Sequence, residues 1–179
     1  KGVNYLEALA KTETVVFDKT GTLTEGRFEV AELNAENGFD KESVLFYAAC
    51  AESLSTHPIA LSIVNGYGRE TDGHAQNVSE TAGKGVSATV DGHAVLAGNA
   101  LLMRESCIEF KETVTSGTTV YVAVDGKFAG SIVIKDKIKR DSAQAIARLK
   151  NTGVKNTVML SGDNEAIARE VAAKTGLDA

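Results

Sequence analysis

The spacing of apolar residues changes twice along the chain, and this change limits the folds open to it. Near the N-terminus, Val15–Phe17 is a short apolar run followed at once by Asp18. Near the C-terminus, Thr157–Leu160 is a second such run, followed by a polar loop and a helical pattern over 165–175. Short, mostly apolar runs are typical of strands that a parallel sheet buries on both faces. Both ends of the chain are therefore expected to be of α/β type.

Between these ends the pattern alternates with a period of two, as in antiparallel strands. Asp91-Gly92 separates the runs VSATV and HAVLA, and Asp125-Gly126 separates TTVYVAV from KFAGSIVI. Asp-Gly between two alternating runs is a strong signal for a tight hairpin. Helical spacing precedes the hairpins over residues 41–54, and Pro58 is well placed to begin another helix. The middle of the chain is thus expected to be an α+β unit with an antiparallel sheet.

The simplest topology is one parallel-sheet domain interrupted by an inserted domain. We predict a discontinuous domain of residues 1–27 and 135–179 and an inserted domain of residues 28–134. Helices are expected at 3–11 and 141–151 in the discontinuous domain, and the strands at 15–17 and 157–160 should be neighbours in its sheet. Open α/β sheets bind ligands at the carboxyl ends of their strands. Residue 18 and residues 161–163 should therefore meet in one crevice.

Composition narrows the class of partner and the compartment. The 179 residues carry a net charge of −5 without a long basic run, so nucleic acid is not an expected partner. Cys50 and Cys107 lack metal-site spacing, which indicates a reducing compartment. No apolar run reaches the roughly 18–20 residues that a membrane-spanning helix needs, and no signal peptide is visible. The chain is expected to be soluble, and its start without methionine indicates a fragment of a longer protein.

Asp18 is the most suggestive residue, because a strand end holds its carboxylate rigidly where a ligand can reach it. An aspartate can attack a phosphoryl group and form an acyl phosphate, and it can also bind Mg²⁺. Lys19, Thr20 and Thr22 follow within four positions and could supply hydrogen-bond donors to phosphate oxygens. The plainer interpretation is that Asp18 only caps a turn.

A second polar loop follows the strand at 157–160. Ser161 and Gly162 offer a hydroxyl and an N–H group at a helix start, where anions are favoured. Asp163 could orient the nucleophile or contact the metal. Ser161 could instead simply cap the helix, but both loops falling on matching strand ends favours a phosphoryl-transfer site over two unrelated caps.

The run DKTGTLT, residues 18–24, resembles the phosphorylation signature of P-type ATPases in all seven positions. This resemblance implies that Asp18 takes the γ-phosphate of ATP, with Mg²⁺ as cofactor and with Asp18 and Thr20 contributing to the metal site. MLSGDN, residues 159–164, resembles the family's second phosphorylation motif, with Ser161 where threonine is usual. Asp136–Lys139 resembles the hinge motif that leads from the inserted domain back to the phosphorylation domain.

The inserted segment resembles the nucleotide-binding domain of the heavy-metal-transporting members of that family. The similarity lies in a glutamate followed by His-Pro, a Gly-Lys-Gly run and a later Gly-Asn pair. It implies an ATP site lined by Glu52, His57, Gly83, Gly85 and Gly98. A glutamate can accept a bond from the adenine amino group, a histidine can stack on the nucleotide, and glycines permit close approach of the backbone. The sequence around these motifs most resembles that of the zinc, cadmium and lead exporters, with copper exporters next.

The resemblance implies a partial haloacid dehalogenase-like phosphorylation domain interrupted by a nucleotide-binding domain, on the cytoplasmic side of the cell membrane. The partners it implies are ATP and the remainder of the same pump, with the transported heavy-metal ion bound elsewhere in the parent. The family's Gly-Asp-Gly-x-Asn-Asp motif and its upstream lysine are absent from this sequence. Because phosphoryl transfer depends on positioning and charge neutralisation, we expect the chain to bind ATP but to phosphorylate itself poorly or not at all.

Two alternatives remain open at this point. A soluble haloacid dehalogenase-like phosphatase would use the middle domain as a substrate cap. Such enzymes usually carry a second aspartate two residues after the nucleophile, where this chain has Thr20. A non-catalytic nucleotide-binding module would need only Glu52, His57 and the glycines, with Asp18 idle.

Overall fold

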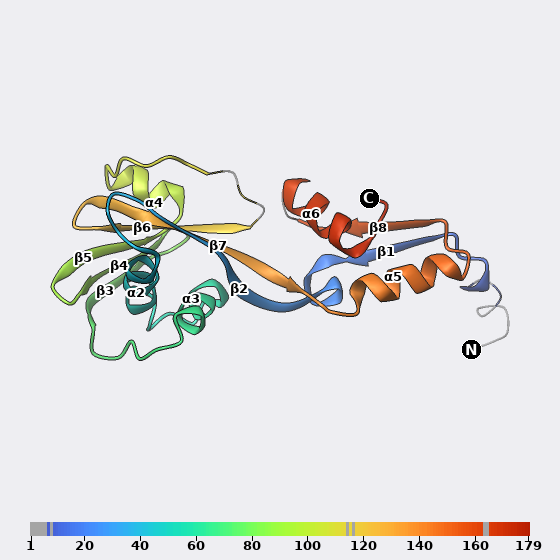
Figure 1. Cartoon of the computed structure of the whole chain (residues 1–179), viewed down its shortest axis with the longest axis horizontal. Helices are drawn as coiled ribbons and strands as arrows, with labels where there is room; N and C mark the ends of the chain where they lie inside the picture. The colour runs from blue at the N-terminus through green and yellow to red at the C-terminus, as the bar shows by residue number, and fades with distance from the viewer. Residues whose placement is uncertain (1–6, 8, 114, 116, 163–164) are drawn as a thin grey trace. The chain divides into compact units, whose positions relative to one another are not determined.

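A computed structural model of the chain describes residues 7, 9–113, 115, 117–162 and 165–179. By its contacts the chain divides into two compact units, one of Lys1–Gly26 with Asp136–Ala179 and one of Arg27–Lys135. In Figure 1 the first unit carries the two ends of the colour scale and the second carries its middle. The helix expected at 3–11 falls mostly outside the described residues.

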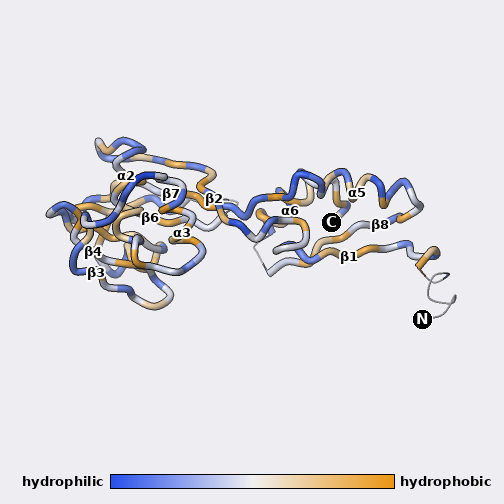
Figure 2. Tube along the Cα trace, turned by 90° about the horizontal axis from the view of Figure 1, so that it is seen from below, coloured by the Kyte–Doolittle hydropathy of each residue, from blue (hydrophilic) through white to orange (hydrophobic). Residues whose placement is uncertain are grey.

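The first unit is built on two parallel strands, β1 (Thr14–Asp18) and β8 (Asn156–Leu160). Their register sets Asp18 opposite Leu160, which confirms that these strands are neighbours. Two helices follow the expected positions closely, α5 (Ser142–Asn151) and α6 (Glu165–Thr175). The expected continuous apolar stretch of β1 is visible in Figure 2.

The expectation that these strands are buried on both faces was wrong. Phe17 and Met159 pack toward a small core that contains Ile146 of α5. On the opposite face Val16 is 52% exposed and Leu160 is 64% exposed. The reason is that only two strands pair in the described part of this unit, and the helices cover one face of them.

The second unit contains a six-stranded sheet whose strand order is β2-β7-β6-β5-β4-β3. The pairs from β3 through β7 are antiparallel. The expected hairpins are present, because both Asp-Gly pairs adopt positive φ angles, as a two-residue turn with right-handed twist requires. The strands are β2 (Thr24–Ala35), β3 (Ala75–Thr81), β4 (Gly85–Val90), β5 (His93–Gly98), β6 (Thr118–Val124) and β7 (Lys127–Ile138).

Three helices cover the two faces of this sheet. The main core lies between one face and the helices α2 (Lys41–Ala51) and α3 (Pro58–Tyr67). The short helix α4 (Ala100–Glu105) packs on the other face (Figure 1). The helix expected over 41–54 ends three residues early, at Ala51. This early end puts Glu52 at the C-cap.

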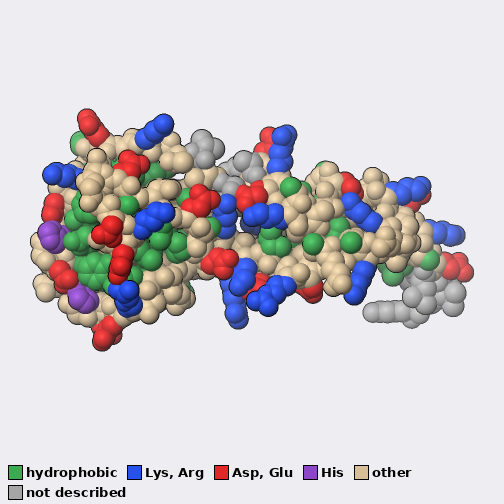
Figure 3. Space-filling model, viewed as in Figure 1, with side chains coloured by type: hydrophobic (Ala, Val, Ile, Leu, Met, Phe, Trp, Pro, Cys, Tyr) green, Lys and Arg blue, Asp and Glu red, His purple; other side chains and the backbone are tan. Residues whose placement is uncertain are grey.

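The surface carries charges of both signs. Figure 3 shows acidic and basic side chains interspersed on the visible face, without a broad field of one sign. Among the described residues, no helix combines the length and the apolar character that crossing a membrane would require.

Candidate functional site

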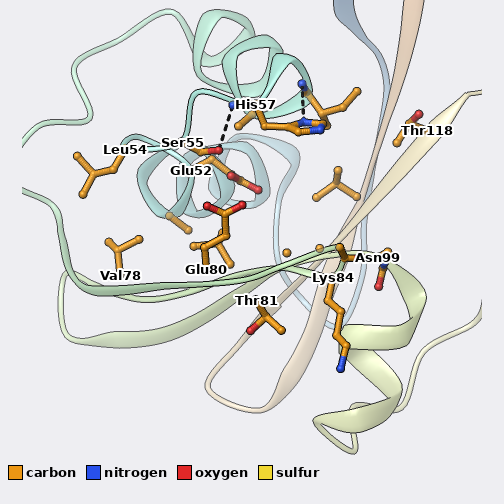
Figure 4. A pocket seen from close by; sticks show the side chains of 18 of the residues that line it. Glu52, Leu54, Ser55, His57, Val78, Glu80, Thr81, Lys84, Asn99 and Thr118 are labelled. Carbon is orange, nitrogen blue, oxygen red and sulfur yellow. Dashed lines mark hydrogen bonds between the residues drawn. The ribbon is translucent and has the colours of Figure 1, made fainter.

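A pocket of about 490 Å³ opens in the second unit where several element ends meet. Its walls come from the C-terminal end of α2, the start of α3, the β3–β4 turn, and parts of β5 and β6 (Figure 4). The pocket lining includes all five residues expected from the sequence to bind nucleotide: Glu52, His57, Gly83, Gly85 and Gly98. Distant segments of the chain thus converge on one cavity.

The three glycines that line this pocket are needed for different structural reasons. Gly83 has φ +71°, and a Cβ added there would meet nothing within 4 Å, so its turn conformation faces open space. Gly85 and Gly98 are paired across β4 and β5. A Cβ on Gly85 would lie 2.3 Å from the carbonyl oxygen of Ala97, and one on Gly98 would lie 2.3 Å from that of Lys84. These two glycines therefore allow the strands to approach each other, besides any approach to a ligand.

Asn99 holds the Gly-Lys-Gly turn in place. Its Nδ2 donates to the carbonyl oxygen of Gly83 at 2.8 Å, and its backbone N–H donates to that of Lys84 at 2.8 Å. Its Oδ1 accepts from the N–H of Leu102 and so caps α4. The sequence motif contained Asn99, but sequence reasoning gave it no role. The signal that could have identified it is a residue type suited to N-capping directly after a strand.

His57 is the N-cap of α3. Its Nδ1 accepts a hydrogen bond from the N–H of Ile59 at 3.2 Å, which fixes the orientation of the ring at the pocket wall. Pro58 follows in the first helical position, where the missing N–H costs nothing. The sequence therefore builds this histidine into a rigid helix start.

The base of the pocket is acidic on one side and apolar on the other. Glu52 is partly buried, and burial followed by the charge of Glu80 raises the pKa of Glu52 to about 7. Leu54 and Val78 line the opening beside them (Figure 4). A cavity with apolar walls and a few polar groups suits a planar heterocycle with hydrogen-bonding edges.

The second candidate site lies in the first unit, at the carboxyl ends of β1 and β8. Asp18 is exposed at the end of β1, and Ser161 and Gly162 directly follow the paired residue Leu160. The strand pairing thus brings Asp18 near the start of the second loop. Asp163 lies outside the described residues.

The loop after Asp18 does not present all of its side chains alike. Thr20 and Thr22 are exposed, and Gly21 has φ +76° in a tight turn. Lys19 is only 8% exposed, in contrast to its exposed neighbours Asp18 and Thr20. That Lys19 donates a hydrogen bond to a phosphate oxygen stays a prediction.

The hinge motif clamps this loop. Asp136 Oδ2 accepts from Thr24 Oγ1 at 2.6 Å, and the Nζ of Lys139 donates to the carbonyl oxygen of Gly21 at 2.7 Å. Ser142 Oγ donates to the carbonyl oxygen of Leu23 at 2.8 Å. Thr24 itself is fully buried. Sequence reasoning identified the hinge aspartate but gave no such role to Thr24, which bonds Asp136, or to Ser142, which bonds Leu23.

A family model described as haloacid dehalogenase-like hydrolase matches residues 12–179. The chain belongs to this family. It is 47% identical over 180 residues, its whole length, to a zinc-transporting ATPase of Synechocystis sp., and 46% identical over 99% of its length to a cadmium, zinc and cobalt-transporting ATPase of Bacillus subtilis. A copper-exporting P-type ATPase of Mycobacterium tuberculosis is 38% identical over 99% of the chain. The chain spans about a quarter of the length of these relatives.

Solved structures give the same result. A zinc-transporting PIB-type ATPase in the E2.Pi state superposes with a TM-score of 0.80 at 33% identity, covering 99% of this chain and 30% of that one. The catalytic domain of the CPx-ATPase CopB-B superposes with a TM-score of 0.72 at 26% identity, covering 99% and 64%. The resemblance of this haloacid dehalogenase-like chain to heavy-metal P-type ATPases is confirmed, and it is stronger to the zinc and cadmium relatives than to the copper one.

Proposed function

We propose that this chain is the ATP-binding part of a heavy-metal-transporting P-type ATPase. In this proposal Arg27–Lys135 is the nucleotide-binding domain, inserted into a phosphorylation domain of which the other unit is a part. The observation that carries the proposal is the convergence of Glu52, His57 and three glycines on one pocket. The similarity to zinc and cadmium transporters over the whole chain supports the same assignment.

The pocket would hold the adenosine part of ATP. Its volume and its apolar wall suit a purine, and Glu52 supplies a polar group for the edge of the base. His57, oriented by its own hydrogen bond, would lie against the nucleotide. Gly83 leaves open space above the β3–β4 turn, where the backbone would approach the ligand.

Asp18 would be the phosphoryl acceptor. One carboxylate oxygen attacks the γ-phosphorus, the bond from that phosphorus to the bridging β–γ oxygen breaks, and ADP leaves with the bond's electron pair. The product is an acyl phosphate on Asp18, whose oxygens Ser161 and Gly162 would bind. Thr20 cannot act as a general acid or base as an aspartate would, so the acyl phosphate persists long enough for a pump to use.

Mg²⁺ is the metal that this chemistry implies. Asp18 offers an exposed carboxylate and Thr20 lies exposed two residues on, and such oxygen donors fit Mg²⁺, which uses few protein ligands and completes its shell with phosphate oxygens and water. When bound, the ion would neutralise charge on the transferred phosphoryl group.

The parent would be an integral membrane pump that exports a heavy-metal ion, with this part on the cytoplasmic side. The ion would bind elsewhere in the parent, and the remaining domains of the pump would be the protein partners. The isolated chain should bind ATP and form little acyl phosphate.

The decisive experiment is a titration of the chain with ATP. Glu52→Ala and His57→Ala should each weaken binding by about tenfold, the loss of one or two hydrogen bonds, whereas Glu109→Ala, an exposed residue that does not line the pocket, should leave affinity unchanged. Unchanged affinity in both pocket variants would exclude the assigned nucleotide site. Rapid turnover of simple phosphomonoesters would instead favour a phosphatase.

A further inference from the structure

Two carboxylates face each other inside the pocket. Glu52 comes from the end of α2 and Glu80 from β3, and their carboxyl groups point toward one another (Figure 4). Like charges at close range disfavour double ionisation, more strongly where one group is partly buried, as Glu52 is. The sequence motifs singled out Glu52 alone and gave Glu80 no role.

No positive charge offsets this pair within the described lining of the pocket. Its only basic or potentially basic side chains are His57 and Lys84. Lys84 Nζ bonds both carboxylate oxygens of Glu105, at 2.7 and 2.8 Å, and points away from Glu52 (Figure 4). The Nδ1 of His57 accepts a hydrogen bond from the N–H of Ile59, so this nitrogen caps α3 and is not directed at Glu52. Binding of a proton by one of the two carboxylates therefore relieves the repulsion between Glu52 and Glu80.

We propose that Glu80 is a positioning residue, whose charge keeps Glu52 protonated for the recognition of adenine. This inference rests on the proposed nucleotide site. A protonated carboxyl group presents a donor and an acceptor side by side. The edge of adenine offers the complementary pair, the N1 acceptor and the N6 amino donor. A carboxylate in the same place could accept from the amino group but would face the N1 lone pair.

The consequence is that adenine nucleotide binding takes up a proton. Burial first, and the charge of Glu80 second, raise the pKa of Glu52 to about 7 in the free chain. A ligand that binds only the protonated form loses affinity as the pH rises through this value, by up to about tenfold per pH unit above it. Removing the Glu80 charge lowers the pKa of Glu52, so the loss of affinity begins at a lower pH.

The test is calorimetric titration of the whole chain with ADP across neutral pH, in buffers of different ionisation enthalpy. The phosphates of ADP also titrate near neutral pH, so profiles are compared between variants, in which the ligand's contribution is the same. Glu80→Gln keeps the side-chain shape and removes its charge. It should bind ADP severalfold more weakly than wild type at about pH 8 and equally at about pH 5.5, because Glu52 is protonated in both proteins only under acidic conditions.

Two further variants locate the effect. Glu80→Asp restores the charge and should restore the wild-type profile, and Glu109→Gln removes a charge outside the pocket and should not shift it. Glu52→Gln presents a donor and an acceptor at every pH. It should therefore lack the loss of ADP affinity that deprotonation of Glu52 causes as the pH rises.

The outcomes distinguish a failure of the role given to Glu80 from a failure of the proposed nucleotide site. If wild type binds ADP and Glu80→Gln has the same pH profile, this inference is wrong while the nucleotide site stands. If Glu52→Gln has the same pH profile as wild type, the proton is taken up elsewhere and this inference is also wrong. If wild type fails to bind ADP at any pH, the proposed function itself falls.

Discussion

Gly85 gives the sharpest test of how this pocket is built. Its φ is +144°, and a Cβ there would lie 2.3 Å from the carbonyl oxygen of Ala97 and 2.5 Å from the Cα of Gly98. Both neighbours are backbone atoms of the paired strand, so no side-chain rotation relieves the overlap. Gly85→Ala must push β4 and β5 apart beside the hydrogen bond from Asn99 N–H to Lys84.

The magnitude follows from two contributions. The strained backbone costs about 1–3 kcal/mol for a residue other than glycine, and the lost hydrogen bond costs about 1 kcal/mol. Gly85→Ala should therefore destabilise the β4–β5 pair by about 2–4 kcal/mol. Gly83→Ala is the matched control, because its φ of +71° is strained but its surroundings are open, and its cost should be about 1–2 kcal/mol.

Native-state hydrogen exchange resolved by segment is the appropriate measurement, since it reports on β4 and β5 without a contribution from the other unit. Gly85→Ala should lower protection there by about one order of magnitude more than Gly83→Ala does, because the two costs differ by about 1–2 kcal/mol. Equal protection in the two variants would refute the close-approach argument. ADP binding adds a second readout, because Gly83→Ala should reduce affinity while leaving the fold nearly intact.

Three further predictions concern residues outside the pocket. Thr24→Val removes the hydrogen bond to Asp136, whose other carboxylate oxygen is already buried without a partner in the described structure, and should destabilise the first unit by about 2–3 kcal/mol in segment-resolved exchange. Hydrogen bonds from a lysine and from a backbone N–H lower the pKa of Asp178 to about 2. The stabilisation from ionised Asp178 is therefore complete above about pH 4 and is lost as the pH falls through about 2. An NMR titration of the Asp178 carboxyl group checks this. Burial raises the pKa of the Cys50 thiol to about 11, so iodoacetamide at about pH 8 should label the exposed Cys107 and spare Cys50, as peptide mass spectrometry would show.

Local patterns in the sequence predicted much of the fold. The Asp-Gly turns predicted two hairpins, and the short apolar runs predicted the neighbouring strands β1 and β8. Turn chemistry and residue spacing are local properties, so they survive without knowledge of the rest of the molecule. The expected breaks at 27/28 and 134/135 and the contact-defined breaks at 26/27 and 135/136 lie one residue apart.

Other features depended on contacts that no local pattern encodes. Burial of β1 on both faces was expected from its composition, yet its outcome depended on how many strands pair beside it. The burial of Lys19 likewise depended on which segments pack over the loop after Asp18. The hydrogen bond from Thr24 to Asp136 joins residues 112 positions apart and could not be read from either motif.

The sequence by itself determined the chemistry available to this protein: an aspartate at the end of a strand, a threonine two residues later, and a glutamate, a histidine and glycines in a recognisable order. Only the tertiary structure decided what surrounds each of these groups. Glu80 acquires its role because a β-strand carries it to face Glu52, which lies 28 positions earlier in the chain. The physical reason is that electrostatic repulsion and desolvation depend on distance through space and on burial, and both are set by the fold.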